Sequence, residues 1–209
     1  NNVISVPGDK SISIRWILFS SLANGVSKAQ NLLMSEDVIA TLNTIKKLGI
    51  KTKLSKNYCK IYGEGLNGYQ YKKNLVINAR NSGTLGRLIL GFLINTPKSI
   101  RLIGDKSLSK RDFRRISEPL SKFGASFKLN NKKNLPLTIC GSSHLKPIKY
   151  FEKRGSAQCK SAVILGAIRT EGTTVIKAKK SRNHTELLCK HLDLPITIKK
   201  SKTYDIIKI

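Results

Sequence analysis

Hydrophobic residues along this 209-residue chain recur at two spacings, one typical of helices and one typical of strands. In some stretches apolar side chains stand three or four positions apart, which places them on one face of a helix. Between these stretches lie short runs with an apolar residue at every second position, as in half-buried strands. The order strand, helix, strand, helix, strand, strand occurs three times with a period of roughly 70 residues.

The first unit spans about residues 3–63. Its predicted elements are a strand at 3–6, a helix from Ser11 to Gly25, a strand at 26–32, a helix from Ser35 to Gly49, and strands at 50–54 and 59–62. Ser35 is a favourable N-cap, and Glu36 and Asp37 follow it in the electropositive first turn of the helix. Capping and the helix dipole therefore explain these two acids.

The second and third units span about residues 73–141 and 146–209. The second has predicted strands at 75–77, 99–103, 125–129 and 135–140, with helices at 84–92 and 113–123. The third has predicted strands at 148–151, 173–177, 194–198 and 204–209, with helices from near Ser156 and at 185–192. Pro119 predicts a kink in its helix. Because no flexible linker separates the units, we expect an α/β (α+β) domain of three βαβαββ units around a shared helical core.

Composition narrows the class of protein. With 40% hydrophobic residues the chain can bury a substantial core, and no apolar run approaches the ~18 residues that cross a bilayer. We therefore expect a soluble, cytoplasmic protein without a signal peptide. The four cysteines, Cys59, Cys140, Cys159 and Cys189, are far apart and are expected to be reduced core thiols. Neither they nor the histidines have metal-ligand spacing, so the sequence predicts no metal site.

The formal charge of +27 raises the question of a polyanionic partner. The basic residues are spread over every segment, and aromatic residues, only 6% of the chain, do not interleave with them along the sequence. A base-stacking platform needs such interleaving, so specific nucleic-acid binding is disfavoured. Attraction of small phosphorylated ligands is the better use of this charge.

The first helix of every unit opens with small, polar or cationic residues. The three openings are Gly8–Ser13, Asn81–Thr84 and Gly155–Gln158. Helix N-termini bind anions through unpaired N–H groups, but the same residue types also serve as ordinary N-caps. Lys10, Ser11 and Arg15 favour an anion site at the first opening, because Ser11 and Arg15 lie one turn apart on the same face.

Five motifs, in this order, carry a resemblance to a known family. They are Val6–Arg15, Asn81–Thr84, Gly104–Arg111, Ser156–Ser161 and Ser181–Glu186. Together they resemble the N-terminal half of 5-enolpyruvylshikimate-3-phosphate synthases over essentially the whole chain. The resemblance implies transfer of an enolpyruvyl group from phosphoenolpyruvate to the 5-hydroxyl of shikimate 3-phosphate, without a cofactor.

The resemblance also implies a set of substrate-binding residues. Those expected to hold shikimate 3-phosphate are Ser11, Arg15, Ser156, Ala157, Gln158 and Ser181, with the serines on its phosphate. Lys10 is expected to contact both substrates, and Gly83, Arg111 and Gln158 to contact phosphoenolpyruvate. The glycine leaves no side chain between the ligand and the helix N-terminus, and the guanidinium matches a phosphate bidentately. Asn81 and Thr84 are expected to support this turn.

Three positions depart from the family pattern. Ile14 stands where the family has His or Asn, Asp112 replaces a proline, and Asn183 replaces a frequent aspartate. Ile14 is expected to loosen the turn at Lys10. Asp112 is expected to compete with phosphoenolpyruvate for the charge of the neighbouring Arg111.

The family completes its site with a second domain that supplies the acid–base groups and closes over the ligands. We therefore assign no catalytic residue here and expect a half-enzyme that binds shikimate 3-phosphate without turning over alone. Residues 10–209 form the expected N-terminal domain, and residues 1–9 are expected to pair with the second, C-terminal domain. A chain that starts without Met and stops at the end of a third unit looks like a piece of something longer.

Three alternatives remain. A non-catalytic module that binds RNA or another polyanion would lose affinity steeply with salt. Half of an enolpyruvyl transferase that acts on a UDP-sugar would share the architecture. A half that meets a separately encoded second half would have the missing motifs in a neighbouring reading frame.

Overall fold

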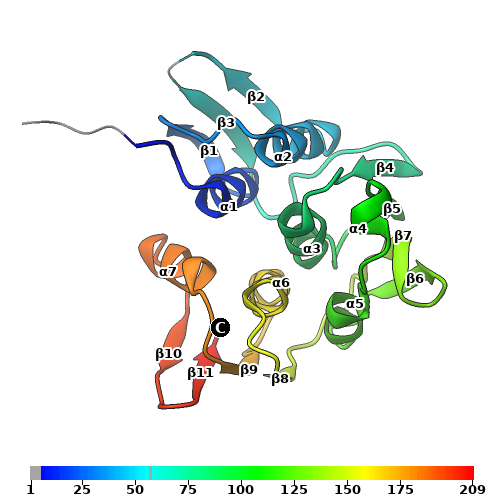
Figure 1. Ribbon diagram of the computed structural model, residues 1–209, viewed down its shortest axis with the longest axis vertical. Coiled ribbons are helices and arrows are strands. Elements are labelled where there is room, and N and C mark those ends of the chain that lie inside the picture. Colours follow the sequence, from blue (N-terminus) through cyan, green and yellow to red (C-terminus); the bar gives the residue numbers. More distant parts are fainter. Residues whose placement is uncertain (1–5, 57) are drawn as a thin grey trace, which may run out of the picture.

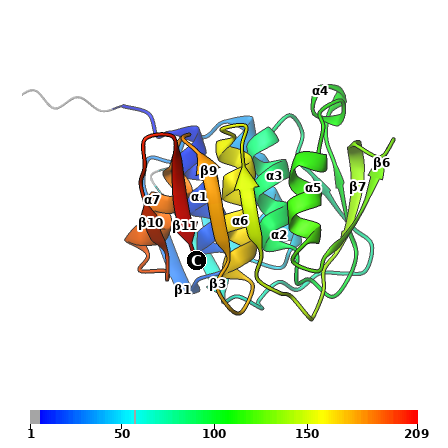
Figure 2. The same cartoon turned by 90° about the horizontal axis from the view of Figure 1, so that it is seen from below.

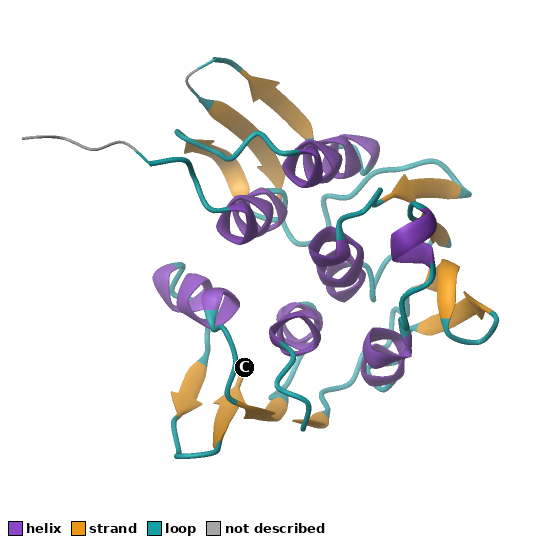
Figure 3. Ribbon diagram, viewed as in Figure 1, coloured by secondary structure: helices purple, strands orange, loops and turns teal. Residues whose placement is uncertain are grey.

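The computed structural model describes residues 6–56 and 58–209. Helices occupy its centre, and three separate sheets lie at the periphery (Figure 1 and Figure 3). This arrangement confirms the predicted α/β fold with a helical core. The strand predicted at 3–6 lies outside the described residues except for Val6, which is exposed and outside any strand.

The first unit contributes two helices and a three-stranded antiparallel sheet. Its elements are α1 (Lys10–Ser20), β1 (Asn24–Ala29), α2 (Glu36–Lys47), β2 (Lys51–Leu54) and β3 (Cys59–Glu64), with strand order β1-β3-β2. Helix α1 ends before the predicted Gly25, because the N–H groups of Leu22 and Ala23 bond to carbonyls three residues back. Such bonds tighten a last helical turn. Gly25 instead lies in β1 with φ of 97°, a conformation that favours glycine.

The second and third units share one topology. The second contains β4 (Leu75–Asn78), α3 (Gly83–Phe92), β5 (Ile100–Ile103), α4 (Lys106–Ser109), α5 (Arg114–Ser121), β6 (Ser126–Asn130) and β7 (Asn134–Cys140). The third contains β8 (Lys149–Glu152), α6 (Ala157–Ile168), β9 (Val175–Lys179), α7 (His184–His191), β10 (Thr197–Lys199) and β11 (Tyr204–Lys208). Their strand orders, β4-β5-β7-β6 and β8-β9-β11-β10, correspond strand for strand. In each, a helix connects the first, parallel pair, as parallel strands require.

The short helix α4 was missing from the sequence prediction. It is a single turn, and its N-cap Asp105 accepts a hydrogen bond of 2.7 Å from the backbone N–H of Leu108. Four residues are too few to show a 3.6-residue period, so only the capping aspartate signalled this helix.

The first helices of the units form the centre of the molecule. Helix α3 lies beside both α1 and α6, and Figure 2 shows α1, α6 and α3 standing behind the third sheet. The α3–α6 crossing is close at Gly91, where a Cβ atom would lie 2.4 Å from the carbonyl oxygen of Ala162. Phe92 of α3 meets Phe19 of α1 edge to face, with ring centroids 5.6 Å apart. Helix α6 is buried from Cys159 to Ala167, consistent with its almost continuous apolar sequence.

The cysteine prediction holds for three residues and is wrong for the fourth. Cys59, Cys159 and Cys189 are buried free thiols, whereas Cys140 is free but exposed. In β7, Leu135, Leu137 and Ile139 face inward, so the two-residue alternation places Cys140 on the solvent side. Pro119 lies inside α5, which continues past it to Ser121.

None of the helices within residues 6–56 and 58–209 has both the length and the apolar content needed to span a bilayer.

Candidate functional site

Hydrogen bonds join the N-terminal parts of helices that belong to different units. Arg15 of α1 bonds to Ser161 of α6 and to Thr185 of α7. Gln158, in the first turn of α6, bonds to Thr84 in the first turn of α3. The segments that carry the predicted site residues therefore meet at one end of the helical core, although they lie up to 170 positions apart in sequence.

The three predicted anion sites are also capped helix ends. Asp9, Ser82 and Ser156 each accept a hydrogen bond from the backbone N–H three residues later, at 2.8, 3.2 and 3.3 Å. The capping interpretation is therefore correct for these side chains. A cap takes up one N–H group, so other N–H groups of the first turn still lack an intrahelical acceptor and can bind a ligand.

Arg15 is almost completely buried, with 5% of its surface exposed. Its Nε donates to Thr185 Oγ1 at 2.7 Å, its Nη2 to Ser161 Oγ at 3.2 Å, and its Nη1 to the carbonyl oxygen of Ser11 at 3.1 Å. Burial lowers the pKa of Arg15, Glu186 opposes this shift, and Arg182 adds to it by repulsion. Ser11 and Arg15 thus lie on one face of α1, as predicted, and the guanidinium is held rigidly.

Gln158 is oriented by Arg87, a residue that the sequence interpretation missed. The Arg87 guanidinium donates to Gln158 Oε1, and Gln158 Nε2 donates to Thr84 Oγ1 at 3.1 Å. Because arginine has only donors, the Gln158 carbonyl must face Arg87, and the bond to Thr84 leaves one amide N–H without a partner among the described residues. Arg87 stands four residues after Gly83 in an otherwise apolar helix, and this isolated charge was the available signal.

Gly83, in the first turn of α3, lies directly beneath the Arg87 side chain. A Cβ atom there would lie 2.7 Å from Arg87 Nη1, and that nitrogen donates to the Gly83 carbonyl oxygen at 3.3 Å. The space above the first turn of α3 is therefore occupied by the Arg87 guanidinium. Burial lowers the pKa of Arg87, Cys159 opposes this shift, and Arg111 and Arg115 add to it by repulsion. Three guanidinium groups thus lie near this end of α3.

The turn at Lys10 opens α1 and is held by a helix cap and an ion pair. Asp9 caps α1, Ile14 is fully buried in the core, and Lys10 forms an ion pair of 3.3 Å with Asp37 of α2. The Lys10 side chain is half exposed, so the pair leaves it accessible. Asp37 was explained from the sequence by the helix dipole alone, and the structure adds an ion pair with Lys10.

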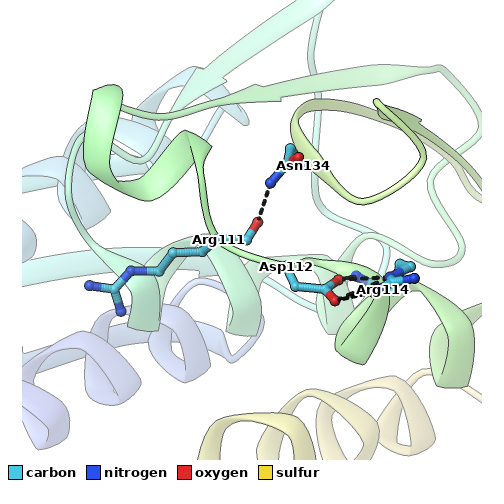
Figure 4. Close-up of polar contacts among 4 residues, drawn as sticks. All are labelled: Arg111, Asp112, Arg114 and Asn134. Carbon is cyan, nitrogen blue, oxygen red and sulfur yellow. Dashed lines mark hydrogen bonds and ion pairs between the residues drawn. The ribbon is translucent and has the colours of Figure 1, made fainter.

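Asp112 does not compete for Arg111. Its carboxylate accepts hydrogen bonds from Arg114, with Nη2–Oδ2 at 2.6 Å and Nε–Oδ1 at 3.1 Å. The exposed Arg111 side chain extends away from Asp112, while its carbonyl oxygen accepts from Asn134 (Figure 4). Arg114, two residues after Asp112, is the better partner, because its N–H groups reach both carboxylate oxygens.

Arg114→Gln is expected to raise the pKa of the Asp112 carboxyl toward its ordinary value, because hydrogen bonds from Arg114 hold that pKa down. Because the Asp112 pKa is lower in the folded than in the unfolded state, the Asp112–Arg114 pair stabilises the fold at pH values above the unfolded-state pKa. This stabilisation is lost as the pH falls through the folded-state pKa. Carboxyl ¹³C NMR titration measures the change. Arg111→Gln is the control and should leave the Asp112 pKa unchanged. If the Asp112 pKa rises in Arg111→Gln and not in Arg114→Gln, Arg111 is the partner, as the sequence predicted.

A buried ion pair lies next to Arg15. Lys160 Nζ of α6 and Glu186 Oε1 of α7 are 2.6 Å apart, and their side chains are 1% and 3% exposed. The sequence interpretation gave neither residue a role. A single lysine inside the apolar run of α6 was the signal, since a buried charge requires a partner.

Ser156, Ala157 and Ser181 complete the predicted set. Ser156 and Ala157 begin α6, and the Ser156 N–H donates to Glu152 Oε2 at 2.8 Å. Ser181 precedes α7, and its Oγ is buried with no hydrogen-bond partner in the part of the chain that the structure describes. A buried hydroxyl without a partner is expected to bind water or a ligand. Asn183, the N-cap position of α7, makes no side-chain capping bond.

No group of three or more His, Cys, Asp and Glu residues suited to a metal ion occurs among the described residues. A cavity of about 240 Å³ adjoins Arg15 between α1 and α7, and its walls include Ile12, Leu187 and Leu188. The other residues that line the cavity are two histidines, His184 and His191.

Comparison with known proteins agrees with the motif resemblance. The EPSP synthase (3-phosphoshikimate 1-carboxyvinyltransferase) family matches residues 1–208. A 3-phosphoshikimate 1-carboxyvinyltransferase of Caldicellulosiruptor bescii is 42% identical over 193 residues, which are 91% of this chain and 44% of that protein. The Streptococcus suis protein of the same name is 44% identical over 185 residues, 88% of this chain and 43% of that protein.

A solved structure of EPSP synthase from Acinetobacter baumannii superposes with a TM-score of 0.88 at 32% identity. It covers 98% of this chain, which in turn covers 46% of that protein. The chain thus spans less than half the length of these relatives and corresponds to their N-terminal half. By sequence and by fold, the chain belongs to the EPSP synthase family.

Proposed function

We propose that this chain is the shikimate 3-phosphate-binding half of a cytoplasmic enolpyruvyl transferase. The reaction would transfer the enolpyruvyl group of phosphoenolpyruvate to the 5-hydroxyl of shikimate 3-phosphate and release phosphate. The observation that carries the proposal is the meeting of the α1, α3 and α6 N-terminal parts through Arg15 and Gln158. The curated relatives above carry the name of the shikimate enzyme, which favours it over the related enzyme that acts on a UDP-sugar.

The residues of this half are suited to binding two anions. Arg15 and Ser181 offer N–H and O–H donors at the α1–α6–α7 side, where Ser181 Oγ lacks a partner among the described residues. Gln158 presents an amide N–H between α6 and α3, beside the positive potential of Arg87 and Arg111. Shikimate 3-phosphate suits the first group and phosphoenolpyruvate the second, because charge-assisted hydrogen bonds favour ionised oxygens.

Catalysis would need more than this half. The charged groups described here would bind and orient anions, and we assign none of them a role in proton transfer. A second, C-terminal domain would supply the acid–base groups and exclude water from the site. We therefore propose that the isolated chain binds shikimate 3-phosphate without turnover.

Calorimetric titration of the chain with shikimate 3-phosphate at moderate salt tests this function. Ser181→Ala is expected to weaken binding at least about tenfold, as for a hydrogen bond to a charged group. It should not change stability, because Ser181 Oγ has no partner among the described residues. Ser156→Ala should weaken binding and also remove a helix cap, at a cost of about 1 kcal/mol. Ser156→Thr keeps the hydroxyl and should retain binding.

Ser126→Ala, in the distant strand β6, is the control and should bind like the wild type. Saturable binding that is lost with Ser181→Ala supports the proposal. If folded Ser181→Ala and Ser156→Ala bind shikimate 3-phosphate as tightly as the wild type, the residue assignment is refuted.

A second candidate function, binding of polyanions, is favoured by one observation. Lys28, Lys60 and Lys53 lie in one cross-strand row on the first sheet, with Lys28 and Lys53 each opposite Lys60. The ammonium groups of Lys28 and Lys60 lie 5.1 and 5.6 Å from the ring centre of Tyr58. Lys60 already lies two residues after Tyr58 in the sequence, and pairing between strands adds Lys28 to this basic–aromatic cluster. Like charges in such a row repel each other, and a bound phosphate chain would relieve this.

The same titration separates the two functions when single-stranded RNA is added as a competitor. If the sheet binds polyanions, RNA affinity falls steeply with salt and with Lys60→Gln, and Ser181→Ala has no effect. If the helix ends bind shikimate 3-phosphate, its binding survives in Lys60→Gln.

A further inference from the structure

We propose that Thr185 and Ser161 are positioning residues that determine which N–H groups of Arg15 face a bound anion. The inference rests on the proposed function for its ligand, whereas the geometry is independent of it. Neither hydroxyl belongs to the predicted substrate-binding set, and both are fully buried, with 0% and 1% exposure.

The hydrogen bonds of the Arg15 guanidinium divide it into two edges. Nε and Nη2 donate to Thr185 Oγ1 and Ser161 Oγ, so the side edge is taken up by hydroxyls. Nη1 donates to the Ser11 carbonyl oxygen. A guanidinium has five N–H groups, and these three bonds to described residues leave one on each terminal nitrogen. We take this remaining pair as the end-on fork, an edge that can bind a phosphate or carboxylate bidentately.

The two hydroxyls are themselves locked. Thr185 Oγ1 accepts from Arg15 and donates to Ser161 Oγ at 2.7 Å. Ser161 Oγ accepts from both Thr185 and Arg15, which occupies its two lone pairs. Because the Thr185 proton points to Ser161 and both lone pairs of Ser161 Oγ are taken up, Arg15 cannot exchange its side edge for its end edge without breaking several hydrogen bonds.

Neutral hydroxyls orient the guanidinium without neutralising it. A carboxylate at the same place would form an ion pair with Arg15 and compete with an anionic ligand. The nearby carboxylate, Glu186, is instead bonded to Lys160 at 2.6 Å. Arg15, Lys160 and Glu186 are all buried, so this cluster has two cations and one anion. An anionic ligand on the free edge of Arg15 would balance it.

The test combines Thr185→Val, which removes the hydroxyl at nearly constant volume, with the rescue variant Thr185→Ser. The first readout needs no ligand: the exchange rate of the Arg15 Nε–H with water, by ¹⁵N NMR, with the signal assigned by its loss in Arg15→Lys. The second is the calorimetric affinity for shikimate 3-phosphate. Thr44→Val is the matched control. Thr44 is a buried helical threonine, and its hydroxyl bonds only to the carbonyl oxygen of Ala40 among the described residues.

Thr185→Val is expected to speed Nε–H exchange and to weaken affinity about tenfold each, the scale of one hydrogen bond to a charged group. Thr185→Ser should restore both, and Thr44→Val should change neither. In an Arg15→Lys background, Thr185→Val should cause no further loss of affinity. If the valine variant is unfolded, Ser161→Ala tests the same edge through its other bond: exchange of the Arg15 Nη2 N–H groups should become faster and affinity should fall about tenfold.

Unchanged Nε–H exchange in folded Thr185→Val overturns the inference, and so does an equal affinity loss in the Arg15→Lys background, which would indicate a general structural effect. If Nε–H exchange responds as expected but the wild type binds no shikimate 3-phosphate, the positioning role stands and the proposed function fails.

Discussion

Glu186→Ala is expected to lower the free energy of unfolding by about 3–5 kcal/mol, the range for breaking a buried ion pair. The substitution leaves the Lys160 ammonium, 1% exposed, without its carboxylate partner at 2.6 Å. Water cannot replace this partner without opening the α6–α7 contact. Urea denaturation followed by circular dichroism measures the change as a shift of the midpoint at constant slope.

Two further variants test the cause of this loss. Lys160→Met/Glu186→Leu removes both charges and should recover most of the stability, since well-packed apolar replacements of buried pairs are often neutral or stabilising. Glu118→Ala removes an exposed helical glutamate and should stay within about 0.5 kcal/mol of the wild type. If Glu186→Ala costs no more than Glu118→Ala, the ion pair makes no contribution to stability.

Gly91→Ala is expected to destabilise the fold by about 3 kcal/mol, at the upper part of the usual range for overpacking. The added Cβ atom would lie 2.4 Å from the Ala162 carbonyl oxygen and 2.9 Å from Leu165 Cβ. The first obstacle is backbone, so α3 and α6 must move apart and lose contacts along the centre of the molecule. Thermal unfolding by calorimetry is the measurement.

Gly86→Ala, one and a half turns earlier in the same helix, is the matched control. Its Cβ atom would meet nothing nearer than Ala79 Cβ at 3.4 Å, an ordinary contact. Alanine is the better helix former by up to about 1 kcal/mol, so this variant should be neutral or slightly stabilised. Similar losses for both glycines would mean that helix flexibility, rather than the α3–α6 crossing, explains the effect.

The elements of the fold were largely readable from the sequence because their signals are local. Periodic apolar positions and capping residues predicted the six longer helices of the three units, and the same topology recurs in the second and third sheets. The errors lie where the signal was short or ambiguous. Gly25 was interpreted as a helix end but lies in a strand, and α4 has only four residues.

The candidate site was readable only in part. Lys10, Ser11, Arg15 and Gln158 stand out at helix starts by residue type. Their partners do not, because hydrogen bonds such as Arg87–Gln158 connect residues 71 positions apart. The same limit explains the wrong partner predicted for Asp112. Its sequence neighbour Arg111 was expected to pair with it, whereas in the fold the Asp112 carboxylate bonds to Arg114.

The sequence by itself determined the repeated units, the helical core and the family, because periodicity, caps and motif order are properties of neighbouring residues. Only the tertiary structure decided which buried charges are paired, which hydroxyls hold Arg15, and why a side chain at Gly91 would collide with the facing helix. These properties depend on distances of a few ångströms between helices of different units. Such distances follow from the packing of the whole core, which no local pattern encodes.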